Sequence, residues 1–542
     1  MKINDLHKFS KLLFILIFFG ILPSFGYSQE NNTEVSDSIH IIRADYIRGE
    51  GSNYDSIKLS GDAQFRQDSV YFYCETALLQ MKSKHIDAVG NIRVIQGDSI
   101  YLYGDTLNYN GITKIAYIRG NVRLIKGDLT LTSNRLTYNM NSNFAYYNTG
   151  GKVISKKNKN TLTSIKGHYY TDYNLLSFKD SVILINPEYV MKSDTLDYNE
   201  KSEITYFSGN TTITGEDNLI FCKNGFYDTR NDVSEFKQDA YLISNGHKIL
   251  GDKLFYDRNK GIGKAIGNIE LSDTSNQLIV SGDYGTRNEK SNISFVTGNT
   301  FVKNWKEKDT LFLTADTIRI VKNNITDNNN LFAYNKVKFY KSDMQGICDS
   351  LVYLKSDSSL KMYNSPILWS DKNQIDGDTI FISLSNNKIK ELNIRNNAFI
   401  IDNVLLFKKL KDSIANDSIG VESIKIDTLT TNYFNQISGK TLKAVFKNDY
   451  INKIYINGNG QSIYFTGEDF KPKEGINKII CSNMVMYFSK NELKDIMFIK
   501  NPEGNLQNIA DVSKEKLILK GFHWEIKERP KSKNDLLIKT HD

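Results

Sequence analysis

Apolar and polar residues alternate with a period of two along most of this chain. In residues 120–139 (GNVRLIKGDLTLTSNRLTYN), Val122 and Leu124 alternate with polar neighbours, and Leu129 and Leu131 do the same. This period is typical of β-strands with one buried face. No long stretch of the sequence shows a helical period with caps at both ends. The pattern therefore predicts an all-β fold.

The strand pattern recurs about every 30 residues, which indicates an array of stacked units. One small residue per unit marks the repeat, in a column made up of Ala44, Cys74, Gly104, Ser133, Gly167, Ser193, Cys222, Gly251, Gly282, Ala315, Cys348, Gly377, Gly439 and Cys481. Most steps are 26 to 34 residues long, and the step of 62 from Gly377 to Gly439 indicates one degenerate repeat. Gly-Asn pairs form a second column, at 90–91, 120–121, 209–210, 267–268, 298–299 and 458–459.

A unit of this length cannot bury its own apolar face, so the units must stack and share one interior. We expect the small column to mark positions where two walls of that interior approach closely. Its most informative members are Gly104, Ser133, Gly251, Gly282, Ala315 and Gly377. We expect the Gly-Asn pairs to supply the bends between strands, because both residues tolerate turn conformations.

The N-terminus has the three-part plan of a secretory signal peptide. Lys2, Lys8 and Lys11 precede or flank the start of an apolar run at 12–22, which is followed by small residues ending at Ser28. The run is short for a membrane span, although an uncleaved anchor is the alternative. We predict a signal peptide at 1–28, cleavage just after it, and export of the mature protein.

The repeat pattern divides the rest of the chain. It predicts one β-repeat region at 29–390, an irregular or degenerate stretch at 391–430, a second repeat segment at 431–530 and a flexible tail at 531–542. The net charge of +7 is spread along the chain. The densest basic run, at 152–160, is typical of a solvated loop, and no nucleic-acid-binding motif accompanies it.

The four cysteines all fall in the small column, in units that are not consecutive. We expect free, buried thiols, because Cα atoms several rungs apart exceed the reach of about 7 Å that a disulfide allows. Zinc is not expected, since no His lies at ligand spacing beside a Cys.

An acid often follows the small residue, at Asp45, Glu75, Asp105, Asp194, Asp252, Asp283, Asp316, Asp349 and Asp378. We interpret these acids as outward-facing groups that bond turn amides; a calcium ladder and catalytic carboxylates are the alternatives. Motifs for nucleophilic, zinc-dependent and nucleotide-dependent catalysis are missing from the sequence. The sequence therefore predicts a protein that is not an enzyme and has no cofactor.

The repeat units at 90–109 and 120–139 resemble the OstA/LptA repeat of lipopolysaccharide transport. The shared pattern is a Gly-Asn-Val strand, a short turn, and an apolar–small–acid–x–Leu–x–Tyr strand. The resemblance runs from about 41 to about 382 and resumes at 435–446, 458–465 and 481–488. It implies a β-jellyroll, or open "taco", that binds acyl chains in an apolar groove.

The resemblance also implies a role as a periplasmic bridge for lipopolysaccharide or lipooligosaccharide. The implied partners are lipopolysaccharide, inner- and outer-membrane transport components, and possible head-to-tail copies of the chain; nucleic acid is not among them. The expected groove lining is Val94, Leu102, Val122, Leu124, Leu131, Ile269 and Leu271. The alternatives are a closed β-solenoid acting as a structural or adhesive surface protein, and a polysaccharide-cleaving β-helix enzyme.

Overall fold

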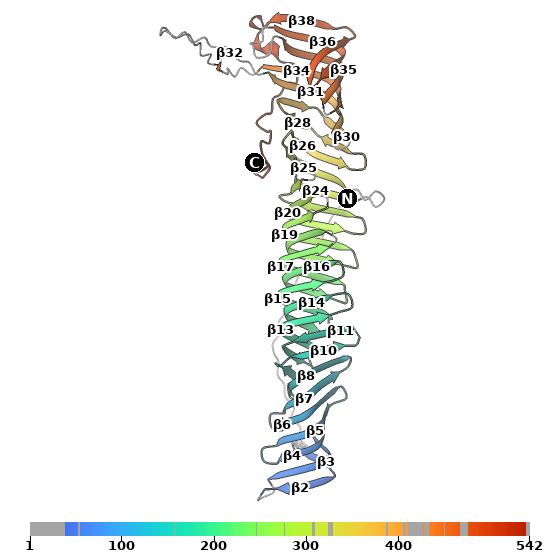
Figure 1. The fold of residues 1–542 in the computed structure, drawn as a ribbon, viewed down its shortest axis with the longest axis vertical. Helices are drawn as coiled ribbons and strands as arrows, with labels where there is room; N and C mark the ends of the chain where they lie inside the picture. Colours follow the sequence, from blue (N-terminus) through green and yellow to red (C-terminus); the bar gives the residue numbers. More distant parts are fainter. Residues whose placement is uncertain are drawn as a thin grey trace, which may run out of the picture.

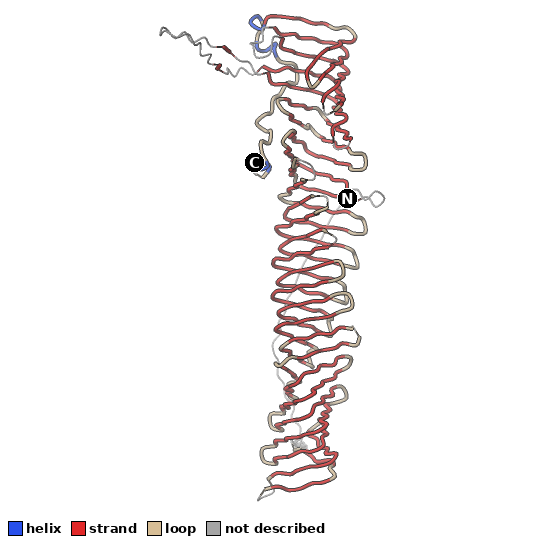
Figure 2. Tube along the Cα trace, in the orientation of Figure 1, coloured by secondary structure: helices blue, strands red, loops and turns tan. Residues whose placement is uncertain are grey.

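The computed structural model of the protein describes residues 38–51, 55–157, 159–244, 246–275, 277–305, 309–322, 329–385, 388–404, 408–409, 426–427, 433–448, 450–466 and 475–537. In this part of the chain, 36 strands form one antiparallel sheet that winds into a long column of stacked rungs (Figures 1 and 2). The all-β, elongated repeat fold predicted from the period is confirmed. The predicted signal peptide lies outside the described residues.

The first strands of the column are β1 (His40–Arg43), β2 (Tyr46–Glu50), β3 (Ser56–Gln67), β4 (Val70–Gln80), β5 (His85–Gln96), β6 (Ile100–Asn110), β7 (Ile115–Lys126), β8 (Leu129–Asn139), β9 (Phe144–Tyr147), β10 (Gly151–Ser155), β11 (Asn160–Ser164) and β12 (Lys166–Tyr170). The next are β13 (Leu175–Ile185), β14 (Val190–Asn199), β15 (Ile204–Thr214), β16 (Asn218–Asp228), β17 (Val233–Ser244), β18 (His247–Asp257), β19 (Ile262–Asp273), β20 (Leu278–Asn288), β21 (Ile293–Thr297), β22 (Phe301–Asn304), β23 (Leu311–Thr314) and β24 (Thr317–Lys322).

The C-terminal part contains β25 (Asn329–Lys341), β26 (Met344–Leu354), β27 (Ser359–Tyr363), β28 (Ile367–Ser370), β29 (Asn373–Asp376), β30 (Thr379–Ser385), β31 (Lys388–Val404), β34 (Tyr433–Lys447), β35 (Tyr450–Thr466), β36 (Gly475–Ser489), β37 (Glu492–Ile499) and β38 (Glu503–Asn508). A separate two-stranded pair joins β32 (Lys408–Lys409) to β33 (Ile426–Asp427). Three short 3-10 helices follow the last strand: η1 (Ile509–Asp511), η2 (Lys514–Leu517) and η3 (Lys533–Leu536).

Five of the six Gly-Asn pairs lie inside long strands, so the prediction that they join strands is wrong for these five. The sixth pair, Gly298-Asn299, lies between β21 and β22, as predicted. In β7, Gly120 and Asn121 take φ of +77° and +46°, and the pairing with β8 shifts register between Arg119 and Val122. Two successive left-handed residues turn the strand sharply while it continues in the sheet. Separate turns, such as 111–114, connect one strand to the next.

This mid-strand corner divides every long strand into two halves, which form two facing walls. In β7, wall A contains residues 115–119 and wall B contains residues 122–126. The Phe72 ring on wall B lies 4.8 Å from the Tyr109 ring on wall A, centroid to centroid, so the inner faces meet. A single apolar cluster between the walls runs from Leu59 in β3 to Met486 in β36.

The small column lies at the corner, where there is no room for bulk. A Cβ added to Gly104 would overlap the Ile118 side chain of the neighbouring strand, and one on Gly377 would overlap Ile394. A serine at this position bonds the bent backbone: the Ser133 hydroxyl donates to the Gly150 carbonyl at 2.7 Å. The corner thus requires a residue that is either very small or able to bond main-chain carbonyls.

In two of the predicted segments the structure shows order that the repeat pattern did not indicate. β31 runs through 388–404 and pairs with β30 and β34 in the main sheet, so the first part of the stretch predicted to be irregular continues the repeat. Residues 531–537 are not a loose tail, because Ser532 and Asp535 form a capping box at η3 and Leu536 is buried. The repeat pattern missed both features, because neither β31 nor the capping box at η3 follows the spacing of the repeat.

Residues 509–537, which we call the strap, turn back from the end of β38 along the column and pass beside β28 and β26 (Figure 1). Leu517 and Leu519 of the strap pack into a second apolar cluster with β31, β35 and β36. No helix in the described part of the chain is long and apolar enough to cross a membrane.

Candidate functional site

The edge of the column opposite the corner determines whether the interior is accessible. There the turns of wall A, such as 111–114, face the turns of wall B, such as 97–99, and we call this edge the mouth. Acyl or other apolar ligands could reach the inner faces of the walls only through the mouth or through an end of the column.

From β3 to β9 the mouth is closed by hydrogen bonds that cross from one wall to the other. The Gln67 side chain on wall B donates to the Gly111 carbonyl at 2.8 Å and accepts from the Tyr109 hydroxyl at 2.8 Å. One repeat later, Gln96 accepts from the Tyr138 hydroxyl at 2.6 Å. We call this part, β3–β9, the sealed sector.

One repeat farther along, Lys126 takes the place that Gln67 and Gln96 have in these cross-wall hydrogen bonds. The Lys126 ammonium donates to the Thr171 carbonyl at 2.6 Å and lies 5.4 Å from the centre of the Tyr169 ring. Burial raises the pKa of the Tyr138 and Tyr169 hydroxyls, so both stay protonated near neutral pH. In each of the three cases, a tyrosine of wall A and a polar side chain of wall B therefore meet and close the mouth.

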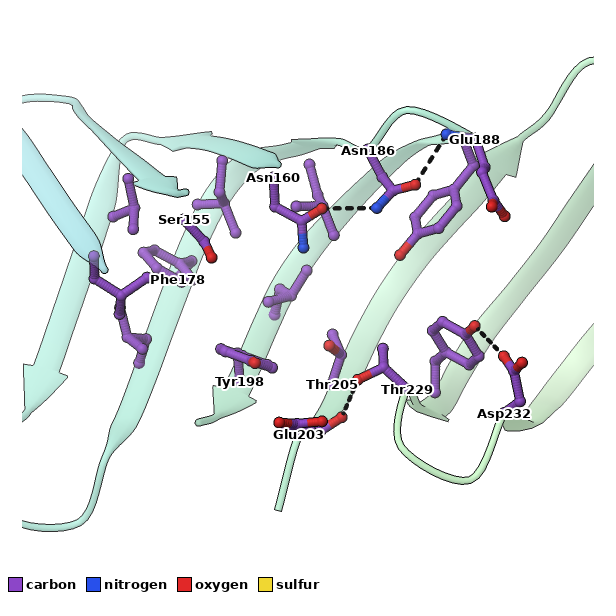
Figure 3. Close-up of a pocket in the computed structure, with 18 of the residues that line it drawn as sticks. Ser155, Asn160, Phe178, Asn186, Glu188, Tyr198, Glu203, Thr205, Thr229 and Asp232 are labelled. Atoms are coloured by element: carbon purple, nitrogen blue, oxygen red, sulfur yellow. Dashed lines mark hydrogen bonds between the residues drawn. The ribbon is translucent and has the colours of Figure 1, made fainter. Parts of the chain in front are cut away.

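A cavity of about 380 Å³ opens directly beyond these cross-wall contacts, in the size range of small-ligand sites. Its apolar floor comes from both walls and consists of Leu129, Val153, Leu162, Leu176, Phe178, Leu184 and Leu196. Its rim is polar and consists of Ser155, Asn160, Asn186, Glu188, Glu203, Thr229, Asp232 and Arg258, with tyrosines 189, 198 and 227 between rim and floor. Figure 3 shows this arrangement, with labelled polar groups on both walls.

The polar groups of the rim are held in place by one another. Asn186 donates to Asn160 at 2.8 Å, and the Tyr227 hydroxyl donates to Asp232 at 2.7 Å (Figure 3). Burial raises the pKa of Tyr189 to about 12, so this phenol is also neutral. An apolar floor under a fixed polar rim suits an amphiphile, whose chain and headgroup need different surroundings.

Two exposed ion pairs bridge the mouth around this cavity. Lys157 on wall B lies 3.1 Å from Glu203 on wall A, and Arg258 on wall A lies 3.2 Å from Glu188 on wall B. Both partners of the second pair are more than half exposed, so the pair is weak and easily exchanged. These bridges neutralise two rim carboxylates without filling the opening.

The inner face stays partly accessible from the cavity through β20. Ile220, Leu242, Ile249 and Leu271 point inward in the same register as Leu102, yet they are only partly buried. The inward positions next to the turns of wall A are Thr205, Ser234 and Gly263 here, where the sealed sector has Ile86, Ala116 and Ala145. Gly263 has no side chain, and a Cβ added there would have its nearest neighbouring atom 3.9 Å away. We call β13–β20 the open sector.

The structure separates the residues that the sequence grouped as groove lining. Val94, Leu102, Val122, Leu124 and Leu131 are at most 4% exposed and lie in or next to the sealed sector. Ile269 is buried and Leu271 is partly buried, and both lie in the open sector. The cavity residues of β10–β18 escaped the sequence analysis because the periodic pattern is the same in both sectors.

The small column is found throughout both sectors. Gly104 and Ser133 lie at corners of the sealed sector, and Gly251 and Gly282 lie at corners of the open sector. Ala315 and Gly377 lie at corners beyond the open sector. The corner is thus a property of the whole column and does not by itself mark a binding site.

The acidic column clamps the corners from outside. Asp105 accepts a hydrogen bond at 2.9 Å from the side-chain amide of Asn121, and Asp252 accepts one at 3.0 Å from Asn268. Asn210 instead donates its backbone N–H to Asp194 at 2.9 Å. The acids thus pair with the Gly-Asn column, mostly through the Asn side chain and not through the turn amides that we expected.

The four cysteines are free and buried at corners, and burial raises the pKa of Cys74, Cys222 and Cys348 to about 12. Such thiols are unreactive near neutral pH. Within the described ranges, no group of three or more His, Cys, Asp or Glu side chains is arranged to hold a metal ion.

Comparison with known proteins identifies two segments of the column. A family model described as "OstA-like protein" matches residues 36–194, and one described as "LptA/(LptD N-terminal domain) LPS transport protein" matches residues 279–388. No curated protein matches the chain. The crystal structure of LptH from Pseudomonas aeruginosa, titled as the LptA homologous periplasmic component of the conserved lipopolysaccharide transport device, is 9% identical. That match covers 34% of this chain and 94% of LptH, with a TM-score of 0.16.

Proposed function

Because two segments of the chain match family models of OstA-like and LptA/LptD-type lipopolysaccharide-transport proteins, we propose that it binds lipopolysaccharide or lipooligosaccharide in the periplasm and bridges the inner and outer membranes. It acts as a non-enzymatic carrier whose partners are the transport components of the two membranes. The observation that carries this proposal is the cavity with its apolar floor and polar rim, which continues into the open sector.

The two sectors make different contributions in this proposal. Acyl chains lie in the open sector, where Ile249 and Leu271 are accessible and Gly263 leaves space on the facing wall. The sealed sector supplies length and rigidity, since its interior is filled by its own side chains. Of the groove residues expected from the sequence, Leu271 is therefore a stronger candidate for lipid contact than Leu102.

Site-specific photocrosslinking in living cells tests the proposal. A photoreactive residue at Ile249 or Leu271 should form adducts with lipopolysaccharide, while one at the buried Leu102 should form few. A photoreactive residue at the exposed, outward-facing Tyr206 controls for non-specific labelling. Adducts at Tyr206 equal to those at Leu271 would contradict the groove, and their absence at all sites would favour a purely structural column.

A structural or adhesive role is the second candidate, and the sealed sector favours it. A closed interior is what a β-solenoid with no ligand would need, and Gln67 and Gln96 help to maintain one here. Saturable binding of a fluorescent fatty acid by delipidated protein would separate the two functions, because a fully closed column has no room for the probe.

A further inference from the structure

The outer face of wall B near the C-terminus is apolar, unlike an ordinary solvated face. In β31, Ile400 packs into the inner cluster, while its neighbours Phe399 and Ile401 point outward and are at most 4% exposed. Ile463 and Phe465 of β35 extend the same outer surface. The strap covers this surface with the side chains of Leu517, Leu519, Phe522 and Trp524.

Two short stretches of the strap, 517–519 around the extended Ile518 and 523–525, are bound through their backbone, and neither is a strand of the sheet. The buried Gln436 side chain donates to the Leu517 carbonyl at 2.8 Å and accepts from the Leu519 N–H at 2.9 Å. Gln374, also buried, makes the same pair of bonds to the His523 carbonyl and the Glu525 N–H, at 2.8 and 2.9 Å. Each amide thus bonds the carbonyl of residue i and the N–H of residue i+2, a pattern that an extended backbone offers regardless of sequence.

Side chains of the strap add specificity to this backbone recognition. The Phe434 ring lies between Phe522 and Trp524, with ring centroids 5.2 and 5.1 Å away. Farther along, the Arg529 guanidinium donates to the Gln345 side chain at 2.8 Å and to the Asp371 carbonyl at 2.6 Å. A lipid tail would use the apolar surface but would make none of the four hydrogen bonds that the two buried glutamine amides form with the strap, at an unfavourable free energy.

The sheet beneath the strap is complete without it. β31, β34, β35 and β36 pair with one another in continuous ladders, and the strap contributes to none of them. The strap therefore resembles a ligand attached to its own binding site.

We propose that the outer face of wall B between Gln345 and Gln436 is a docking site for an extended polypeptide. Residues 517–529 are its resident ligand, and a partner protein's extended segment with apolar residues in the strap's spacing occupies the site when the strap is displaced. This inference is independent of lipid carriage, because the site lies outside the walls and uses none of the residues of the mouth.

Peptide binding to the full-length chain tests this proposal. A fluorescent synthetic peptide of residues 514–531 is titrated into the wild type and into a strap-released variant, Leu519→Asp with Trp524→Asp. Because a tethered segment competes at an effective concentration on the millimolar scale, the released variant should bind the peptide at least about tenfold more tightly. Ile518→Asp, at an exposed strap position between two buried leucines, is the matched control and should behave as wild type.

Adding Gln374→Ala to the released variant should weaken peptide binding at least about tenfold, since it removes a bidentate backbone contact. Equal peptide binding by the wild type and a folded released variant would overturn the proposal. Binding of a fluorescent fatty acid, but not of the peptide, by the released variant would assign the face to lipid and would also overturn it.

Hydrogen exchange on the unmodified chain gives a second readout that does not depend on any variant folding. The amides of Leu519 and Glu525 should exchange together, and well before those of the β34–β36 ladder. Exchange of the strap only in step with that ladder would show that the strap is an inseparable part of the core, contrary to the proposal.

Discussion

The sealed and open sectors have the same strands, the same corners and the same period, yet only one of them has an accessible interior. Leu102 in the sealed sector is fully buried, whereas Leu271 in the same register of the open sector is partly exposed. The difference arises at the edge opposite the corner. Glutamine and tyrosine close that edge at Gln67 and Gln96, while an unfilled cavity follows it.

This comparison teaches that a continuous apolar stripe is not the same as a continuous groove. Stacking buries the stripe in both sectors, but access depends on a few side chains at the tips of the walls. In the sealed sector the tips bond one another across the mouth. In the open sector a cavity takes the place of such bonds, and Gly263 leaves space on wall A.

The largest effect on stability is expected from a bulky side chain placed at a corner of the sealed sector. Gly104→Trp should lower the free energy of unfolding by about 3 kcal/mol or more, the upper end for overpacking, because even a Cβ there overlaps Ile118. Hydrogen exchange of the β5–β8 amides measures the loss. Arg123→Trp, on the exposed face of the same rung, is the control and should change exchange little. Equal effects would mean that the corner is not close-packed.

Opening the sealed mouth should have an intermediate effect. Gln96→Ala removes the nearer acceptor of the Tyr138 hydroxyl, at 2.6 Å against 3.4 Å for Asn143, and should cost about 1–3 kcal/mol. It should also raise lipid crosslinking from a photoreactive residue at position 94. Gln64→Ala, whose side chain bonds only at the surface, is the control. If crosslinking at position 94 stays at the wild-type level in the Gln96→Ala variant, these cross-wall hydrogen bonds do not control access.

Filling the open sector should affect lipid more than stability. Gly263→Leu points into space whose nearest atom is 3.9 Å from the added Cβ, so the free energy of unfolding should change by less than about 1 kcal/mol. Crosslinking of lipopolysaccharide at position 271 should nevertheless fall several-fold. The adjacent Lys264→Leu, on the outer face, should leave crosslinking intact. A fall with both variants would point to a loss of folding.

The smallest effect is expected from the exposed bridge across the cavity. Glu188→Gln breaks the pair with Arg258 and should change stability by less than about 1 kcal/mol. The variant should also lose the salt dependence that this pair gives to fatty-acid binding, when affinity is measured at low and high salt. An unchanged salt dependence would show that the ion pair between Glu188 and Arg258 does not affect access to the cavity.

The corner could be predicted from the sequence only in part. The small and Gly-Asn columns were visible, and so was the need for two walls, but the pairs were assigned to turns. The correct position depends on φ at Gly120 and Asn121 within an unbroken ladder, which a sequence pattern does not encode. Asp105 and Asn121, 16 positions apart, meet only after the strands pair.

By itself, the sequence determined the period, the repeat length, the all-β stack and the resemblance to the OstA/LptA repeat. Local alternation dictates which face of a strand is buried, and a unit without its own core must stack. Only the tertiary structure decided where that stack is closed and what lies on its outside. Gln67 and Gly111 are 44 residues apart, and Gln374 and Glu525 are 151 apart, so each contact exists only when folding brings two distant segments together.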